Sequence, residues 1–324
     1  MADGRAWPRI SIVTPSFNQG RYLEETIRSV LCQGYPNLEY IIIDGGSTDN
    51  SVEIIKRYAD RIAYWVSEKD DGQVEAICKG AARCTGEIIN WLNADDYLLP
   101  GSLKAIAEAW QACSRQDVVL CGDGVRVGMN GAFLRCCKVA TITEPIIPGP
   151  PVGGGIQASW FVGKRGWDRI GGLDRTLDYT MDTDFYQRCY ENGFLFKQLD
   201  VALAAYREHD STKTIRGWKR SIAFKKRYYG KHLSALPPRE RSLYEPRVRK
   251  LIWGLHLRSL TRGDSFFTRA QKVCGAISVW PSSLFEPRRA AGLVWGLLTG
   301  TSLERRLLLL ARDDPQGNEH SRVA

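Results

Sequence analysis

Strands and helices alternate along the first 60 residues, and this alternation constrains the fold more than any other feature of the chain. Apolar runs at 8–15 and 38–43 are typical of buried strands, and helical spacing of apolar residues follows each of them, at 21–31 and 52–58. This order predicts a parallel sheet with covering helices. The loops after the strands then share one edge of the sheet, where open α/β folds bind ligands.

A third apolar run, 88–92, leads into an acidic segment at that edge. The segment contains Asn93, Asp95 and Asp96. Adjacent carboxylates repel each other unless a cation or hydrogen-bond donors are present. Oxygen ligands that leave room for substrate phosphates suit Mg²⁺ or Mn²⁺. The segment therefore predicts a divalent metal site, although an Asp-Asp pair at a strand end also occurs in turns and helix caps.

The loop after the second run, Asp44-Gly-Gly-Ser-Thr-Asp49, is a second candidate for ligand binding. Its glycines would let the backbone approach a ligand closely, and Asp44 could accept hydrogen bonds from a nucleobase or ribose. An ordinary turn followed by a capping Ser47 or Asp49 is the alternative. No G-x-x-x-x-G-K loop occurs, and no G-x-G-x-x-G follows the first run. A nucleotide diphosphate would therefore depend on the metal to balance its charge.

Several segments in a fixed order resemble the family 2 glycosyltransferases, which have the GT-A fold, use nucleotide-sugar donors and invert the anomeric centre. The donor-side segments are Thr14–Leu23, Ile41–Asp49, Asp71-Gly-Gln73 with Gly80 and Gly86, and Leu92–Asp96. The later segments are Gln157–Phe161, Gly171–Asp174 and Tyr179–Arg188. The resemblance covers roughly residues 8–214, and it implies a mostly parallel nucleotide-binding sheet.

The resemblance implies roles for individual residues. The residues at the nucleotide-sugar donor would be Thr14, Pro15, Asp44, Asp71, Asn93 and Asp95. The ligands of the Mg²⁺ or Mn²⁺ that bridges to the donor diphosphate would be Asp95, Asp96 and His209. Arg207 and Lys213 are candidate charge partners beside His209.

Asp182 matches the acid that this family uses as general base on the acceptor hydroxyl. Phe185, Tyr186 and Leu195 indicate a helix that begins after a loop, so Asp182 would lie in its first turn, where a carboxylate can equally be a cap. Asp184 would face elsewhere on the same helix and be structural or position the acceptor.

Three positions depart from the family's pattern. Gly45 stands where many relatives have a second aspartate, Cys78 where an asparagine is common, and Asn93 where the acidic segment often begins with an aspartate. Activity is still expected, because the principal acids remain. A catalytically inactive nucleotide-sugar binding or scaffold protein is one alternative. A sugar nucleotidyltransferase is another, although residues 14–21 offer little of its glycine-rich basic loop.

The carboxyl-terminal third is strongly basic. Residues 215–324 contain 22 Lys and Arg against 8 Asp and Glu, a net charge of +14, whereas the whole chain carries +9. The pattern indicates helices with interspersed aromatic residues, and its uncharged stretches are shorter than the roughly 20 residues of a membrane span. Such a segment suits the surface of an anionic membrane, although a helical lid with a solvated basic face is the alternative. No nucleic-acid-binding motif accompanies the charge, so no nucleic-acid partner is expected.

We therefore expect a catalytic domain at 1–214, with a donor half at about 8–120 and an acceptor half at 121–214, and a basic helical extension at 215–324. Residues 1–7 lack an apolar signal region, and nine cysteines without a C-x-x-C pair favour a reducing compartment. The expected place of action is the cytoplasmic face of the cell membrane, on a saccharide or lipid-linked saccharide acceptor. The stretch 149–155 is expected to be a mobile loop between the two halves.

Overall fold

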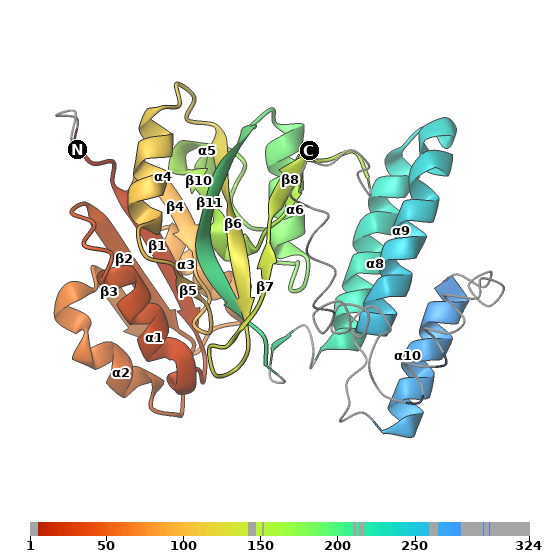
Figure 1. Ribbon diagram of the computed structural model, residues 1–324, viewed down its shortest axis with the longest axis horizontal. Helices are drawn as coiled ribbons and strands as arrows, with labels where there is room; N and C mark the ends of the chain where they lie inside the picture. The colour runs from red at the N-terminus through yellow and green to blue at the C-terminus, as the bar shows by residue number, and fades with distance from the viewer. Residues whose placement is uncertain are drawn as a thin grey trace, which may run out of the picture. The chain divides into compact units, whose positions relative to one another are not determined.

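The computed structural model describes residues 6–141, 147–150, 152–209, 212–213, 217–258 and 265–279, together with Val294 and Leu298. The chain divides into two compact units, Met1–Asp210 and Ser211–Ala324 (Figure 1). The boundary expected from the charge pattern is residue 214.

The first unit is built on one large sheet with strand order β3-β2-β1-β4-β10-β6-β11-β5. Its first four strands are parallel to one another: β1 (Ile10–Ser16), β2 (Leu38–Asp44), β3 (Tyr64–Ser67) and β4 (Ile88–Trp91). Every residue of β1 and β4 is buried, which explains their unbroken apolar runs. The carboxyl ends of these strands meet at one edge of the sheet.

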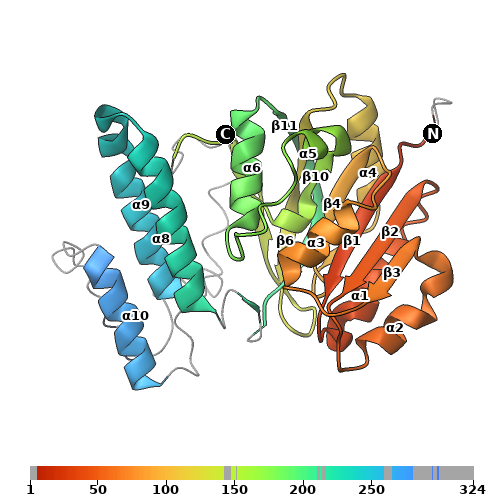
Figure 2. The same ribbon diagram turned by 180° about the vertical axis from the view of Figure 1, so that it is seen from behind.

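Helices cover both faces of this sheet because alternate strand residues point to opposite sides. Ile10, Ile12 and Ile42 share one core cluster with α1 (Gly20–Leu31), α2 (Ser51–Arg57) and α4 (Ser102–Gln111). Val13, Ile41 and Ile43 face the other cluster, with α3 (Gln73–Ala81), α5 (Lys164–Arg169) and α6 (Met181–Glu191). Figures 1 and 2 show these two helical layers from opposite sides.

The second half of the sheet is mixed. β10 runs antiparallel to both β4 and β6, whereas β11 runs parallel to β6 and so ends at the same edge as β4. The strands of this half are β5 (Tyr97–Leu98), β6 (Val118–Val127), β7 (Phe133–Cys137), β10 (Trp160–Gly163) and β11 (Leu195–Arg207).

The glycine-rich stretch 149–155 differs from the expected loop. It contains β9 (Val152–Gly154), which pairs antiparallel with β8 (Val139–Thr141), and the short helix η2 (Gln157–Ser159) follows. Backbone hydrogen bonds to β8 therefore hold part of this segment. Residues 142–146 and 151 lie outside the description.

The helices of the second unit whose bounds are described are α8 (Trp218–Ala235), α9 (Pro238–Arg258) and α10 (Phe266–Val279). Buried apolar side chains join them, among them Ile222 of α8, Ile252 of α9 and Val273 of α10. These helices agree with the expected helical extension, whereas the predicted apolar stretches beyond residue 280 lie outside the description apart from Val294 and Leu298. Within the described residues, no helix combines the length and apolar character that a bilayer span requires.

Candidate functional site

A buried arginine from the end of β11 holds the acidic loop that follows β4. The backbone N–H of Arg207 donates to Asp96 Oδ1 at 3.0 Å, and its Nε donates to the carbonyl oxygen of Asp95 at 3.1 Å. The guanidinium also donates to Glu25 Oε2 at 2.5 Å and lies 5.0 Å from the ring centre of Tyr22, both on α1. Only 2 % of Arg207 is exposed. The structure therefore makes Arg207 an internal support of the loop and not an exposed charge partner.

The two carboxylates of the acidic segment face different surroundings. Asp96 is buried and accepts a hydrogen bond from Asn93 Nδ2 at 3.1 Å in addition to the one from Arg207. Burial, together with the charge of Asp95, raises the pKa of the Asp96 carboxyl above its ordinary value. Asn93 in turn accepts from Gln73 Nε2 at 2.7 Å, which ties the loop to the first turn of α3. Asp96 thus lies on the inner side of the loop.

Asp95 lies on the outer side and meets His209. Its Oδ2 is 3.0 Å from His209 Nε2, although 114 positions separate the two residues along the chain. The His209 ring is buried and packs against Tyr22 at 4.9 Å between ring centres. Among the described residues there is no group of three or more His, Cys, Asp or Glu side chains that would enclose a metal ion. The Asp95 carboxylate beside the imidazole leaves places for phosphate oxygens and waters, and these oxygen ligands are the ones that Mg²⁺ and Mn²⁺ prefer.

Three of the residues predicted at the nucleotide, Thr14, Pro15 and Asp44, are buried. Thr14 is buried and its Oγ1 is 3.0 Å from the hydroxyl of Tyr40. Asp44 has no exposed surface, and it accepts hydrogen bonds from the N–H and hydroxyl of Ser47 and from the hydroxyl of Ser67. Pro15 is buried beside them. In this structure Asp44 therefore stabilises the turn after β2.

A neighbouring acid fills the space left by the glycine at position 45. A Cβ atom on Gly45 would lie 2.9 Å from Asp70 Oδ2. Burial raises the pKa of the Asp70 carboxyl, which also accepts the Gly72 N–H at 2.9 Å. A second carboxylate therefore does lie beside the β2 turn, contributed by a distant loop. Sequence reasoning missed Asp70, although it directly precedes the Asp71-Gly-Gln73 motif.

Asp182 lies at the start of α6, in the first turn, as expected. Burial raises the pKa of the Tyr186 hydroxyl, which lies one turn later on α6. Neighbouring ionisable groups, among them Asp182, raise this pKa to a lesser degree. Gln157 lies near this hydroxyl and donates from Nε2 to the carbonyl oxygen of Trp91 at 2.8 Å. Since Trp91 ends β4, the helix that carries Asp182 lies beside the strand that leads into the acidic loop.

The other acid of this helix has a structural contact. Asp184 Oδ2 accepts a hydrogen bond from Arg188 Nε at 2.7 Å. Arg188 also donates to the carbonyl oxygens of Ile170 at 2.9 Å and Gly172 at 2.8 Å. Asp184 therefore orients the arginine that holds the 170–172 turn.

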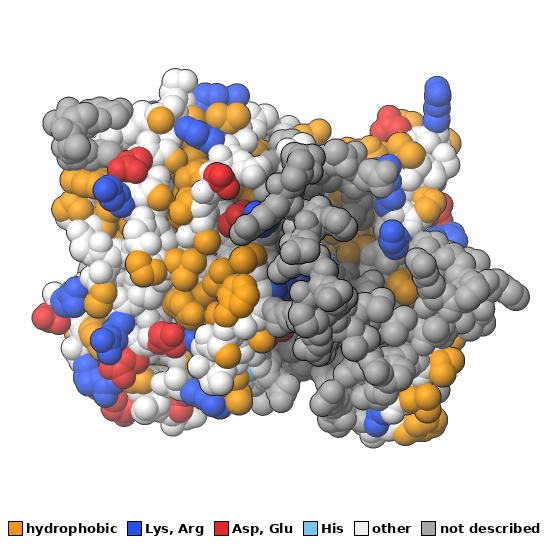
Figure 3. All heavy atoms as spheres, viewed as in Figure 1, with side chains coloured by type: hydrophobic (Ala, Val, Ile, Leu, Met, Phe, Trp, Pro, Cys, Tyr) orange, Lys and Arg blue, Asp and Glu red, His pale blue; other side chains and the backbone are white. Residues whose placement is uncertain are grey.

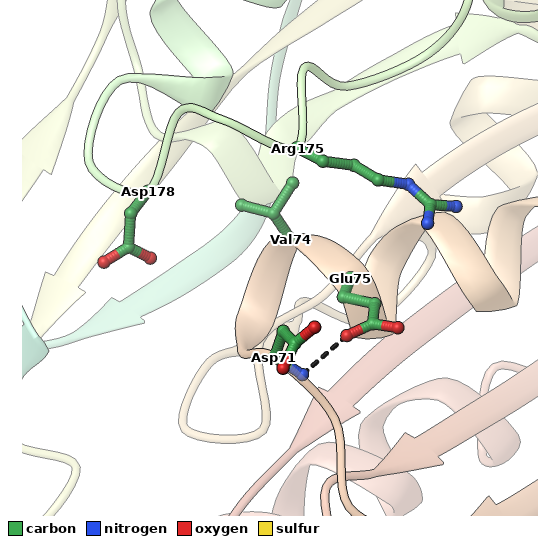
Figure 4. Close-up of a pocket in the computed structure, with 5 residues that line it drawn as sticks. All are labelled: Asp71, Val74, Glu75, Arg175 and Asp178. Atoms are coloured by element: carbon green, nitrogen blue, oxygen red, sulfur yellow. Dashed lines mark hydrogen bonds between the residues drawn. The ribbon is translucent and has the colours of Figure 1, made fainter.

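A pocket opens between the start of α3 and the loop that precedes α6 (Figure 4). Its lining residues are Asp71, Val74, Glu75, Arg175 and Asp178. The backbone N–H of Asp71 donates to Glu75 Oε2 at 2.5 Å. Three carboxylates against one guanidinium make this lining negative, so it would repel a diphosphate.

Comparison with known proteins identifies the class. The sequence model of glycosyl transferase family 2 matches residues 11–135. An uncharacterized glycosyltransferase of Mycobacterium tuberculosis is 31% identical over 189 residues, which are 56% of this chain and 68% of that protein. An uncharacterized glycosyltransferase of Nostoc sp. is 36% identical over 114 residues, which are 34% of either chain. A third, from Rickettsia felis, is 27% identical, and the chain covers 31% of its length. The chain thus spans about a third of the length of these last two relatives.

Solved structures share the fold at low sequence identity. The mannosyltransferase PcManGT of Pyrobaculum calidifontis, in complex with GDP-Man and Mn²⁺, is 16% identical with a TM-score of 0.56, over 95% of this chain and 85% of that one. TarS of S. aureus is 16% identical with a TM-score of 0.54, over 85% of this chain and 55% of that one.

The chain belongs to glycosyl transferase family 2. The predicted family and the predicted α/β fold of GT-A type are confirmed.

Proposed function

We propose that this protein transfers a sugar from a nucleotide-sugar donor to an acceptor hydroxyl with inversion at the anomeric carbon. The observation that carries the proposal is the convergence of Asp95 and His209 at the sheet edge, close to the strand end that contacts the Asp182 helix. A neighbour of the same fold was solved with GDP-Man and Mn²⁺, and TarS was solved with UDP-GlcNAc. Both complexes support a nucleotide sugar as the class of donor.

Asp95 and His209 are the residues that would hold Mg²⁺ or Mn²⁺ together with the donor diphosphate. A bound divalent ion neutralises the negative charge that grows on the departing nucleoside diphosphate. Asp96, Asn93 and Arg207 act behind this pair, because their hydrogen bonds fix the loop that presents Asp95. Support of this kind from behind the ligands orients a metal site.

Asp182 is proposed to accept the proton of the acceptor hydroxyl as that oxygen attacks the anomeric carbon. A hydroxyl is a poor nucleophile at neutral pH, so a base within hydrogen-bond reach is required. The support is that Asp182 lies at the start of α6 as a half-buried carboxylate near the Tyr186 hydroxyl. One displacement with one base inverts the configuration.

The proposed acceptor is a saccharide, and in particular a lipid-linked saccharide of surface polysaccharide synthesis on the cytoplasmic face of the membrane. The support is the basic segment 215–324, with 22 Lys and Arg against 8 Asp and Glu. Basic residues near an anionic bilayer each contribute about 1 kcal/mol to binding. Figure 3 shows Lys and Arg side chains on the described part of this segment.

Product analysis tests the proposed reaction. Purified protein with Mn²⁺ and a panel of nucleotide sugars should release the nucleoside diphosphate in step with acceptor glycosylation. Release of pyrophosphate from a nucleoside triphosphate and a sugar 1-phosphate, offered in a separate assay, would instead indicate a sugar nucleotidyltransferase. Tight donor binding without turnover on any acceptor would indicate the inactive nucleotide-sugar binding protein.

A further inference from the structure

Among the described residues of the second unit, the most exposed large apolar side chains lie at the start of α10. Phe266 and Phe267, the first two residues of that helix, are 66 % and 71 % exposed. Leu298 is 67 % exposed, and its carbonyl oxygen accepts a hydrogen bond from Arg269 Nη1 at 2.9 Å, one turn from Phe266. Phe266, Phe267 and Leu298 are called the apolar tip below.

Packing on the opposite part of α10 fixes the direction of the two phenylalanines. Val273 and Ala276 are buried against α9, where they contact Trp253. Lys272 is 2 % exposed, and its Nζ lies 4.9 Å from the ring centre of Trp218 on α8. These contacts are made by the later turns of α10, so the first turn of the helix projects beyond the packed region. The phenylalanines are therefore held outward by a packed helix.

The charge around the apolar tip indicates what it meets. The segment 215–324 that contains it carries a net charge of +14, and Arg269 lies beside the apolar tip. Exposed aromatic side chains among basic residues match the two layers of an anionic lipid surface, which offers acyl chains beneath negative head groups. Apolar side chains gathered in this way on a soluble surface mark an interaction site.

We propose that the apolar tip inserts into an anionic lipid bilayer while Lys and Arg side chains of the same segment bind its head groups. This inference rests on the membrane association proposed above and assigns the residues that carry it. Phe266 and Phe267 supply the apolar contact, and Arg269 anchors the Leu298 backbone beside them. Insertion makes binding depend on apolar area as well as on charge.

Co-sedimentation with lipid vesicles tests the inference on the full chain. The wild type should bind vesicles of phosphatidylglycerol and phosphatidylcholine more tightly than vesicles of phosphatidylcholine alone, and salt should weaken this binding. The double variant Phe266→Ser/Phe267→Ser should lose at least about tenfold in partition to the mixed vesicles, because two apolar side chains no longer leave water.

Leu243→Ser is the matched control, since Leu243 is an exposed apolar residue of the same unit at 53 % exposure. It lies early in α9, roughly 22 Å along the helix from Arg258, where α9 ends before α10. This control should bind vesicles as the wild type does. Equal vesicle binding by the double variant and the wild type would overturn the inference, as would a wild type that ignores anionic vesicles.

Two further measurements keep the outcomes distinct. Sedimentation velocity without lipid should show the same mass for the wild type and the double variant; a wild-type dimer that the double variant loses would mean that the apolar tip binds a second copy instead. The rate of nucleoside diphosphate release during sugar transfer to a soluble acceptor should be equal in both proteins. Its absence in the wild type would count against the proposed reaction and leave the vesicle result intact.

Discussion

Arg207 shows how a single buried side chain organises the proposed active site. It donates to the Asp95 carbonyl through its side chain and to Asp96 through its backbone, and it reaches Glu25 on α1. Lysine cannot replace this set of contacts, because its ammonium group is one point charge where the guanidinium is a planar fork with five donors.

Arg207→Lys should therefore weaken metal binding and leave the fold in place. The expected change is a rise of about 10- to 100-fold in the apparent dissociation constant for Mn²⁺ in the presence of nucleoside diphosphate, as found when residues behind a metal ligand are changed. Titration calorimetry measures it. Glu25→Gln is the milder control, because it retains an acceptor oxygen for Arg207. Unchanged Mn²⁺ affinity in Arg207→Lys would contradict the positioning role.

Asp182→Asn should lower turnover by a factor on the order of 10² to 10⁴ and leave donor affinity nearly unchanged, because an amide cannot accept the acceptor's proton. Steady-state kinetics together with donor titration separates the two effects. Asp184→Asn is the control on the same helix. Because it weakens the contact with Arg188, it should lower the unfolding temperature, whereas its effect on turnover should be small. An Asp182→Asn protein with wild-type turnover would remove Asp182 from the mechanism.

At the scale of elements, the sequence predicted the strands that determine the donor side. The runs at 8–15, 38–43 and 88–92 became β1, β2 and β4 with small changes at their ends, because fully buried parallel strands leave unbroken apolar runs. The antiparallel insertion of β10 between β4 and β6 was not predicted. Strand partners this far apart in the chain leave no local signal. β9 was missed for another reason: its stretch is rich in glycine, which is depleted in strands.

The site residues were predicted unevenly. The placement of Asp95 next to His209 followed from family resemblance, since no spacing rule joins residues 114 positions apart. The inward orientation of Asp96 and the burial of Arg207 depend on β11, so the sequence of the acidic loop alone could not reveal them. Asp70 was missed because its proximity to Gly45 is a contact between two loops.

The close approach of α3 to β1 yields a prediction at this scale. A Cβ on Gly80 would lie 2.3 Å from Val13 Cγ1, so Gly80→Ala forces α3 away from the sheet. The expected destabilisation is about 1–3 kcal/mol, read from urea unfolding. Gly230→Ala in α8 is the matched control, because nothing lies within 4 Å of its added Cβ. Equal stability of Gly80→Ala and the wild type would contradict this close packing.

At the scale of the whole molecule, the two units should respond to different conditions. Donor and metal should stabilise the first unit, since binding to the folded state alone raises its stability. The second unit contains His256. Burial lowers the pKa of its imidazole to about 4, and the charge of Lys226 makes a lesser contribution. Its unfolded form takes up a proton below a pH of about 6.5, well before the folded form does.

The helical unit should therefore lose stability as the pH falls from about 6.5 toward about 4. His256→Leu should remove this part of the pH dependence, because leucine does not titrate. The measurement is the urea midpoint of helical circular dichroism at several pH values. A wild type and a variant with the same pH profile between 6.5 and 5 would show that His256 does not contribute.

The central claim is that Asp95 and His209 bind a nucleoside diphosphate through a divalent ion, and one titration tests it most directly. Calorimetric affinity for UDP and GDP should be measured with Mn²⁺ and with EDTA, in the wild type and in Asp95→Asn and His209→Gln. The account predicts at least about tenfold tighter wild-type binding of one of these nucleotides with Mn²⁺, and loss of this difference in both variants. The claim would be contradicted if the wild type bound the nucleotides and transferred sugar equally well with Mn²⁺ and with EDTA. Variants that bind and transfer as the wild type does would contradict it as well.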